Sequence, residues 1–311
     1  MTKIAIVFPG QGAQHVGMGQ DFSEQYTEAK AVFEAASEAM GYSMEDLCFN
    51  SSAEELKKTE NTQPSILTAS YAMYKVLEAK GVKAEAFAGL SLGEYTAHVA
   101  AGTMPFEAAV KVVRKRGQYM QEEVPMGVGT MAAILGLSRE AVEDACEKAS
   151  TVGVVEPANY NCPKQLVIAG EVNAVEQAVE NCKEAGAKKA VLLPVSAPFH
   201  TSMLIGAGEK LSKELENVTY GAFDKPVVSN VTALYYPDSA SINELLVRQV
   251  SSPVKWEDSV QQLIDDGFDT FIEVGPGDAL TKFGKRISKD LNLFTVNSVE
   301  SMEKTLEALG L

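Results

Sequence analysis

The sequence predicts an α/β fold that carries an inserted ferredoxin-like unit, and two observations support this prediction. Strand-like and helix-like runs alternate along most of the 311 residues, as in a parallel sheet covered by helices. Between residues 126 and 195 the order becomes β-α-β-β-α-β, the ferredoxin-like pattern. We therefore expect a large α/β domain over residues 1–125 and 196–311 and a small subdomain over residues 126–195.

The large domain begins with an apolar strand at residues 3–8 and a glycine-rich loop, which leads into a helical stretch to about Ala39. Pro105 suits the first turn of a helix, because a residue there needs no backbone N–H. The other elements expected in this domain are strands at 86–90 and 269–274 and helices at 64–79, 92–101, 105–120, 201–216, 241–250, 255–266 and from Asp278 onward.

Capping residues mark the helices of the small subdomain. Ser138 is the expected cap of its first helix, which runs to about Ala149. Asn173, with Glu176 three residues on, resembles a cap for the second helix, which ends near Gly186. The expected strands lie at 130–137, 152–155, 165–169 and 189–195.

Composition excludes several classes of protein. Hydrophobic residues make up 46% and charged residues 22%, as in globular domains. Lys and Arg number 27 against 42 Asp and Glu, a net charge of −15, which argues against nucleic-acid binding and should repel anionic membranes. No apolar run reaches the roughly 18 residues of a membrane span, and the first residues do not resemble a secretion signal.

Cysteine and histidine usage indicates a cytoplasmic protein without a metal. The three histidines lie far from one another and from any cysteine at the spacing of a zinc site. The cysteines form no C-x-x-C pair, as expected of free thiols in a reducing compartment. These residues are His15, His98 and His200, and Cys48, Cys146, Cys162 and Cys182.

A serine motif gives the strongest chemical signal. Gly89-Leu-Ser-Leu-Gly93 lies between an apolar strand and a helix, as a nucleophile elbow requires. The tight turn needs small flanking residues and exposes the Ser91 hydroxyl at the edge of the sheet. The helix N-terminus behind it offers N–H groups to an oxyanion. A structural turn without chemistry is the alternative.

A nucleophilic serine needs a base, and the three histidines are unequal candidates. His98 follows Ser91 by seven residues, or about 10 Å along a helix axis, so it cannot reach the hydroxyl. His15 lies in the glycine loop, either near a site or exposed to solvent. His200 lies where the chain re-enters the large domain, and a loop there can face a cleft between domains.

The glycine loop Gly10-Gln-Gly-Ala-Gln-His15 is a near miss for two nucleotide-binding motifs. The third glycine of the dinucleotide fingerprint is absent, and Met18 stands where a P-loop has its lysine. The loop is therefore either a flexible turn or the source of a backbone N–H, from Gln11, aimed at the Ser91 site.

Arg116 falls on the apolar face of the helix expected at 105–120. A buried arginine must meet an anion, because an unpaired charge is costly to bury. The partner is either an internal Asp or Glu or a carboxylate on the substrate, held bidentately.

Several segments together resemble the malonyl-CoA:acyl-carrier-protein transacylases. The resemblance runs from residue 4 to about residue 280 and rests on Phe8–Gln14, Gly89–Tyr95, Arg116, Asn159–Gly170, Pro198–His200 and Glu273–Gly277. It implies a hydrolase-like core with a parallel sheet and a ferredoxin-like insert. It also implies transfer of a malonyl group from malonyl-CoA to the phosphopantetheine thiol of an acyl carrier protein, with CoA as part of a substrate and no cofactor.

The resemblance implies catalytic roles for matching residues. Ser91 is the implied nucleophile and His200 the implied base. Backbone N–H groups of Gln11 and Leu92 are the implied oxyanion hole. The backbone carbonyl of Gln249 is expected to orient the histidine in place of an acid.

The resemblance also implies how the acyl group is bound. Arg116 is expected to bind the malonyl carboxylate, and Gln63, Asn159 and Phe199 to contact the substrate. Phe199 before the histidine is typical of malonyl-selective members. Leu90 departs from the family, where many members have His, but this side chain is not needed for proton transfer.

Alternatives remain open at this point. A serine hydrolase or thioesterase usually places its histidine late, whereas no histidine occurs in the last 111 residues. A binding module that holds CoA or a carrier protein, and an acyltransferase that serves a polyketide pathway, are the others. We expect a cytoplasmic monomer that supplies fatty acid synthesis. Lys282, Lys285, Arg286 and Lys289 form either a carrier-docking patch or a solvated helix face.

Overall fold

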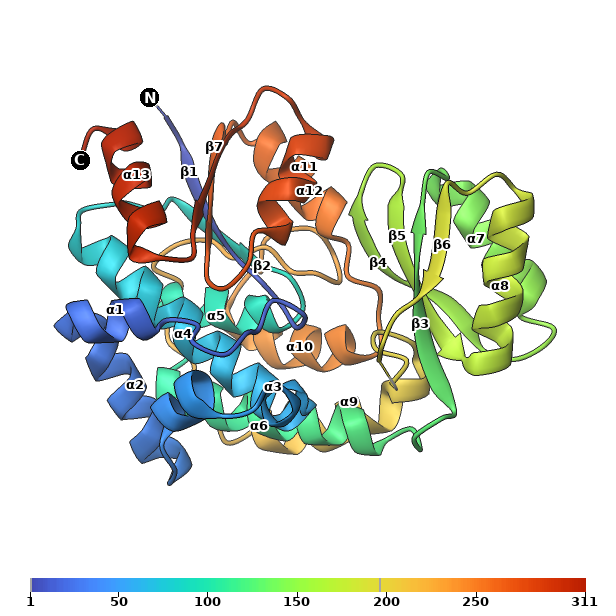
Figure 1. Cartoon of the computed structure of the whole chain (residues 1–311), viewed down its shortest axis with the longest axis horizontal. Helices are drawn as coiled ribbons and strands as arrows, with labels where there is room; N and C mark the ends of the chain where they lie inside the picture. Colours follow the sequence, from blue (N-terminus) through green and yellow to red (C-terminus); the bar gives the residue numbers. More distant parts are fainter. Residues whose placement is uncertain (1, 196) are drawn as a thin grey trace.

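The computed structural model describes residues 2–195 and 197–311, which contain two four-stranded sheets (Figure 1). The sheet of the larger part is parallel, with strand order β2-β1-β7-β8. Its strands are β1 (Ile4–Phe8), β2 (Ala86–Gly89), β7 (Thr270–Val274) and β8 (Asn292–Val296). The predicted α/β class with a parallel core sheet is confirmed.

Both faces of this sheet are buried. In β1, Ile6 and Phe8 pack in one apolar cluster, whereas Ala5 and Val7 pack in another, because successive side chains of a strand point to opposite faces. Double burial explains the continuous apolar run at the start of the sequence. The helices of this part are α1 (Gln20–Gln25), α2 (Thr27–Met40), α3 (Ala53–Lys57), α4 (Thr59–Ala79), α5 (Leu92–Ala100), α6 (Phe106–Glu122), α9 (Ile205–Leu215), α10 (Ile242–Val250), α11 (Trp256–Asp265), α12 (Ala279–Ile287) and α13 (Val299–Leu309).

Helix α4 begins at Thr59, five residues before the expected start at Pro64. The side chain of Asn61 donates to the carbonyl of Glu55 at 3.1 Å, and that of Thr62 donates to the carbonyl of Leu56 at 2.6 Å. These bonds tie an additional turn to the preceding helix. Pro64 then lies inside the helix, where it cannot donate a backbone hydrogen bond to the carbonyl four residues earlier.

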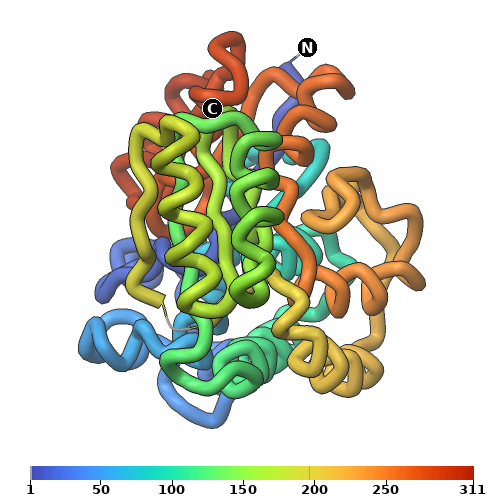
Figure 2. Tube along the Cα trace, turned by 90° about the vertical axis from the view of Figure 1, so that its right-hand side faces the viewer, coloured from blue at the N-terminus to red at the C-terminus, as the bar shows by residue number. Residues whose placement is uncertain are grey.

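The second sheet is antiparallel, with order β4-β5-β3-β6. Helices α7 and α8 lie side by side on one face of it (Figure 2). This is the predicted ferredoxin-like arrangement. Its elements are β3 (Gly129–Leu135), α7 (Arg139–Ala149), β4 (Val155–Cys162), β5 (Gln165–Glu171), α8 (Val172–Glu184) and β6 (Lys189–Leu192). The domain boundaries stay a prediction, and the boundary residue 196, like residue 1, lies outside the described residues.

The strand expected at 152–155 was misplaced, because the observed strand β4 only begins at Val155. Its second half, Asn159-Tyr-Asn-Cys162, has no apolar alternation to reveal it. It pairs with β5 on one side and, through Tyr160 N–H to the Val254 carbonyl at 2.9 Å, with the larger part on the other. Tertiary pairing therefore extends this strand.

The cap expected at Asn173 is wrong. Helix α8 begins at Val172, and its cap position, Glu171, makes no side-chain capping bond. The N–H groups of Glu171 and Val172 instead donate to the carbonyls of Val154 and Val128, at 2.7 and 3.0 Å. These bonds satisfy the N–H groups of the cap position and of the first helical residue. The cap at Ser138 forms as predicted, with Ala141 N–H as donor.

In the described part of the chain, no helix has the length and apolar character needed to cross a bilayer.

Candidate active site

Ser91 lies in a sharp turn between β2 and α5, at the carboxyl edge of the parallel sheet. Its φ of 53° and ψ of −105° are strained for a residue other than glycine. The two flanking glycines allow close packing of the turn: a Cβ on Gly89 would lie 1.9 Å from the Gly93 carbonyl carbon, and one on Gly93 would lie 2.1 Å from the Phe8 oxygen. The G-x-S-x-G pattern therefore has a steric cause here.

The imidazole of His200 lies on the Ser91 hydroxyl. Ser91 Oγ and His200 Nε2 are 2.7 Å apart, and His200 Nδ1 lies 2.8 Å from the Gln249 backbone carbonyl. A carbonyl only accepts, so Nδ1 carries the proton and Nε2 offers a lone pair to the hydroxyl. This arrangement can remove the serine proton during nucleophilic attack.

Burial lowers the pKa of His200 to about 4, and the neighbouring positive charge of Arg116 lowers it further in the same direction. The imidazole is therefore neutral at neutral pH, which is the form a general base requires.

Arg116 enters the site from α6 and is 1% exposed. Its Nη1 donates to Gln63 Oε1 at 2.9 Å, and its Nη2 donates to Ser91 Oγ and Gln249 Oε1, both at 3.0 Å. Within the described residues, Arg116 forms no ion pair with a carboxylate. A buried guanidinium with neutral partners can still form stronger, charge-assisted hydrogen bonds with an anionic group, so the carboxylate-binding role of Arg116 stays a prediction.

A buried glutamate lies behind Gln249. The amide nitrogen Nε2 of Gln249 donates to Glu94 Oε2 at 2.5 Å and to the Ser91 carbonyl at 3.0 Å. Glu94 also accepts from the Tyr236 hydroxyl and, at 3.1 Å, from Asn230 N–H. Burial raises the pKa of Glu94 to about 7 against the lowering effect of these hydrogen bonds and of Arg116.

The elbow is also braced by Asn230. Its Oδ1 accepts from Ser91 N–H at 2.7 Å, and its Nδ2 donates to the Gly89 carbonyl at 2.7 Å. Sequence reasoning missed Asn230, Tyr236 and the role of Glu94. Glu94 stood within the quoted motif, and its place on the first turn of a buried helix was the available signal; Asn230 and Tyr236 carry no local signal.

The glycine loop packs against the elbow. A Cβ on Gly10 would lie 2.4 Å from the Leu90 carbonyl oxygen, and Gln11 follows directly. Leu92 is the first residue of α5, so its N–H has no acceptor within the helix. Both predicted oxyanion donors thus belong to segments that adjoin Ser91.

The remaining predicted residues lie apart from this hydrogen-bond network. Phe199 and Asn159 are 9% and 8% exposed. Within the described residues, neither forms a hydrogen bond with Ser91, His200 or Arg116, so their substrate contacts stay a prediction.

The other two histidines are not bases for Ser91. His98 is buried in α5, and its Nδ1 lies 3.0 Å from Thr103 Oγ1. His15 is exposed, with Nδ1 3.5 Å from the Ala13 carbonyl of its own loop. Among residues 2–195 and 197–311, no group of His, Cys, Asp and Glu side chains is arranged to hold a metal.

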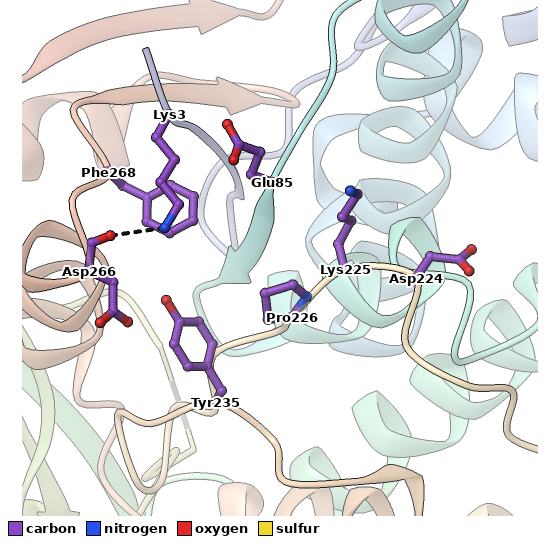
Figure 3. A pocket seen from close by; sticks show the side chains of 8 residues that line it. All are labelled: Lys3, Glu85, Asp224, Lys225, Pro226, Tyr235, Asp266 and Phe268. Carbon is purple, nitrogen blue, oxygen red and sulfur yellow. Dashed lines mark hydrogen bonds between the residues drawn. The ribbon is translucent and has the colours of Figure 1, made fainter. Parts of the chain in front are cut away.

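A depression of about 580 Å³ lies elsewhere, at the opposite edge of the sheet (Figure 3). Lys3, Glu85 and Phe268 in its lining stand just before β1, β2 and β7. It therefore faces the amino ends of the strands, whereas Ser91 follows a carboxyl end, where ligands of such sheets bind.

Comparison with known proteins assigns the class. Residues 5–309 match the acyl transferase domain family. The chain therefore belongs to the acyl transferase family, in agreement with the elbow and its histidine.

The individual relatives narrow the class. The chain is 44% identical to a malonyl CoA-acyl carrier protein transacylase of Bacillus subtilis, over 99% of this chain and 98% of the relative. The crystal structure of such a transacylase from Clostridium perfringens matches with a TM-score of 0.97 and 47% identity, covering 99% of this chain and 98% of that one. A chain from the structure of a type II PKS acyl-carrier protein in complex with its malonyl-transacylase also matches, with a TM-score of 0.96 and 40% identity over 99% of this chain and 100% of that one.

Proposed function

We propose that this protein transfers the malonyl group of malonyl-CoA to the phosphopantetheine thiol of an acyl carrier protein, through a malonyl ester on Ser91. The observation that carries the proposal is the buried Arg116 guanidinium, which lies 3.0 Å from the nucleophile and has no carboxylate partner within the described residues. A carboxylate at the far end of the acyl group suits this position.

In the first half-reaction, His200 Nε2 takes the Ser91 proton as Oγ bonds to the thioester carbonyl carbon. The carbonyl oxygen becomes an oxyanion that accepts from the N–H groups of Gln11 and Leu92; loss of one such donor typically costs about 3–4 kcal/mol. The carbon–sulfur bond then breaks, the imidazolium returns the proton to sulfur, and CoA leaves as a thiol.

The second half-reaction runs the same chemistry in reverse. His200 removes the proton of the carrier's phosphopantetheine thiol, whose sulfur attacks the malonyl-Ser91 carbonyl carbon. The carbon–oxygen bond breaks, and the proton returns to Ser91 Oγ. Water must lose this competition, and an Arg116–carboxylate pair that holds the acyl group and closes the site favours the thiol.

Intact-protein mass spectrometry after addition of malonyl-CoA tests the proposal. We expect an increase equal to one malonyl group, mapped to Ser91, lost on addition of carrier thiol and absent in Ser91→Ala. Rapid hydrolysis of malonyl-CoA without an acceptor would instead favour a serine hydrolase. An unmodified protein that binds CoA would indicate a binding module.

The carrier proteins of such systems are strongly acidic, and the cations of α12 are our candidate docking surface. Lys282, Lys285 and Arg286 are exposed, although Lys282 pairs with Asp278 at 2.8 Å. Lys289 lies beyond the end of the helix at Ile287. Reversal of two of these charges should raise the KM for the carrier protein and leave Ser91 acylation unchanged; an unchanged KM would make this a solvated helix face.

We further propose a cytoplasmic monomer that needs no cofactor and supplies fatty acid synthesis. The chemistry of the two half-reactions requires only the malonyl thioester and the carrier thiol. The same transfer chemistry would serve a polyketide carrier, so assay with both kinds of carrier protein distinguishes the pathways.

A further inference from the structure

We infer that Glu94, as a carboxylate, is a positioning residue for the acyl carboxylate: it acts through the amide of Gln249 to hold the Arg116 guanidinium at Ser91. This inference rests on the proposed function and adds a residue to its selectivity. Within the described residues, the Glu94 carboxylate forms no hydrogen bond with Ser91; only the Glu94 backbone N–H does, to the Ser91 carbonyl at 3.1 Å.

The contacts of the Gln249 side chain fix which way its amide oxygen and nitrogen point. Arg116 can only donate, so it needs the amide oxygen of Gln249, which lies 3.0 Å from Nη2. The amide nitrogen must then point the other way, where it donates to Glu94 Oε2 at 2.5 Å. An ionised carboxylate can only accept, so it stabilises this orientation and opposes the flipped one.

Arg116 and Glu94 carry opposite charges on either side of the Gln249 amide. Arg116 and Glu94 are 1% and 0% exposed, and burying either charge alone is costly. The Gln249 amide separates them, so Glu94 offsets the positive charge without occupying the guanidinium in a direct ion pair. The guanidinium thereby stays available to a substrate carboxylate.

The carboxylate is itself fixed by two further donors. The Tyr236 hydroxyl donates to Oε1 and Asn230 N–H donates to Oε2. Asn230 also holds Ser91 N–H at 2.7 Å. Asn230 therefore holds both Glu94 and Ser91, and the position of the Glu94 carboxylate is determined independently of any substrate.

A change of Glu94→Gln keeps the shape, removes the offsetting charge and weakens the preference for the observed orientation of Gln249, which the Ser91 carbonyl and Arg116 alone would then support. We expect kcat/KM for malonyl-CoA to fall about tenfold or more. The effect should be mainly on KM, because the contact between Arg116 and the acyl carboxylate, which this change weakens, is made both before and during the reaction. The kcat/KM for acetyl-CoA, which lacks the carboxylate, should change less than threefold. In an Arg116→Ala background, Glu94→Gln should produce no further change in the malonyl:acetyl ratio.

Glu273→Gln is the matched control. Glu273 is also buried, but it accepts from the N–H groups of Leu280 and Thr281, at 3.1 and 2.7 Å, away from this network. The Glu273→Gln change should lower the free energy of unfolding of the protein without altering its malonyl:acetyl ratio.

The pH dependence of the malonyl:acetyl ratio of the wild-type protein provides a second test. Around Glu94, burial raises the pKa of Tyr95 and Tyr236, lowers the pKa of His98 to about 3 and lowers that of His200 to about 4. Burial also lowers the pKa of Arg116, which nevertheless stays a cation in this range. Glu94, with a pKa of about 7, is then the group in this cluster that titrates near neutrality. The malonyl:acetyl ratio should fall as pH decreases through 7, and this step should vanish in Glu94→Gln.

The outcomes separate the two proposals. A wild-type malonyl-Ser91 adduct combined with an unchanged ratio in Glu94→Gln, or with a pH-independent wild-type ratio, would overturn the role of Glu94 and leave the transferase intact. No adduct in the wild type would overturn both.

Discussion

Arg116 is a buried positive charge whose hydrogen-bond partners Gln63, Ser91 and Gln249 are all neutral. Such a group gains most from an incoming anion, because hydrogen bonds between charged groups are stronger than neutral ones. At the residue scale, we therefore expect the acyl selectivity of this site to depend on one guanidinium and on the amides that hold it.

Arg116→Ala should reduce malonyl transfer by about 10- to 150-fold, equivalent to a lost charged hydrogen bond of about 1.5–3 kcal/mol. Acetyl transfer should fall far less, which steady-state kinetics with both thioesters will measure. Lys115→Ala, an exposed neighbour on the same helix, is the control. Equal losses for both substrates would refute the carboxylate role.

The pH profile of acetyl transfer should report His200 alone. Its neutral form is the base, and its pKa is lowered to about 4, so the rate should stay level from pH 8 to about 5 and fall as pH decreases through about 4. Because Arg116 contributes to the lowering, Arg116→Ala should move the midpoint upward. A wild-type midpoint near 6.5 would show that the imidazole titrates like a free one.

At the scale of elements, the site depends on how closely α5 approaches β1 and β2. The close contacts of Gly89 and Gly93 leave no room for a methyl group. The strained φ of Ser91 persists because Asn230 holds both its N–H and the Gly89 carbonyl.

Gly93→Ala should destabilise the protein by about 1–3 kcal/mol, the usual cost of overpacking, and should lower activity by moving the elbow. Chemical denaturation measures the first effect and acylation of Ser91 the second. Gly206→Ala is the control, because the atoms nearest to its new Cβ are the end of the flexible Glu123 side chain, with Oε1 at 2.0 Å, and not backbone. Equal stability of the two variants would contradict the packing argument.

At the scale of the whole molecule, the antiparallel unit supports the segment that carries the base. Glu156 on β4 accepts from Ser202 N–H at 2.8 Å and from Ser202 Oγ at 2.5 Å, two residues after His200. Arg139 on α7 forms a bidentate ion pair with Asp258 on α11, in which Nη2 donates at 2.8 Å and Nη1 at 3.1 Å. Figure 1 shows β4 as the strand of this unit that faces the larger part.

Glu156→Ala should release the His200 segment and lower kcat about fivefold, as expected for a loss near 1 kcal/mol. The malonyl:acetyl ratio should not change, since Arg116 is untouched. Glu147→Ala, an exposed change on α7, should leave the rate unaltered. A shift in the ratio for Glu156→Ala would contradict a role through His200 alone.

Local signals in the sequence determined the fold class, the β-α-β-β-α-β element order of the insert and the elbow, because apolar periodicity, glycines and turn residues act over a few positions. The same signals placed the Ser138 cap correctly. They could not find the end of β4, the uncapped start of α8, or β8 with α13, although Ser298 and Ser301 form a capping box that marks α13.

The tertiary structure alone decided what Arg116 contacts. Sequence left the arginine's partner open between an internal acid and a substrate, whereas the fold gives it neutral amides and places Glu94 one residue further away. These contacts join residues 25 to 155 positions apart. No local rule encodes such pairings, because each depends on how the sheet, its helices and the inserted unit pack together.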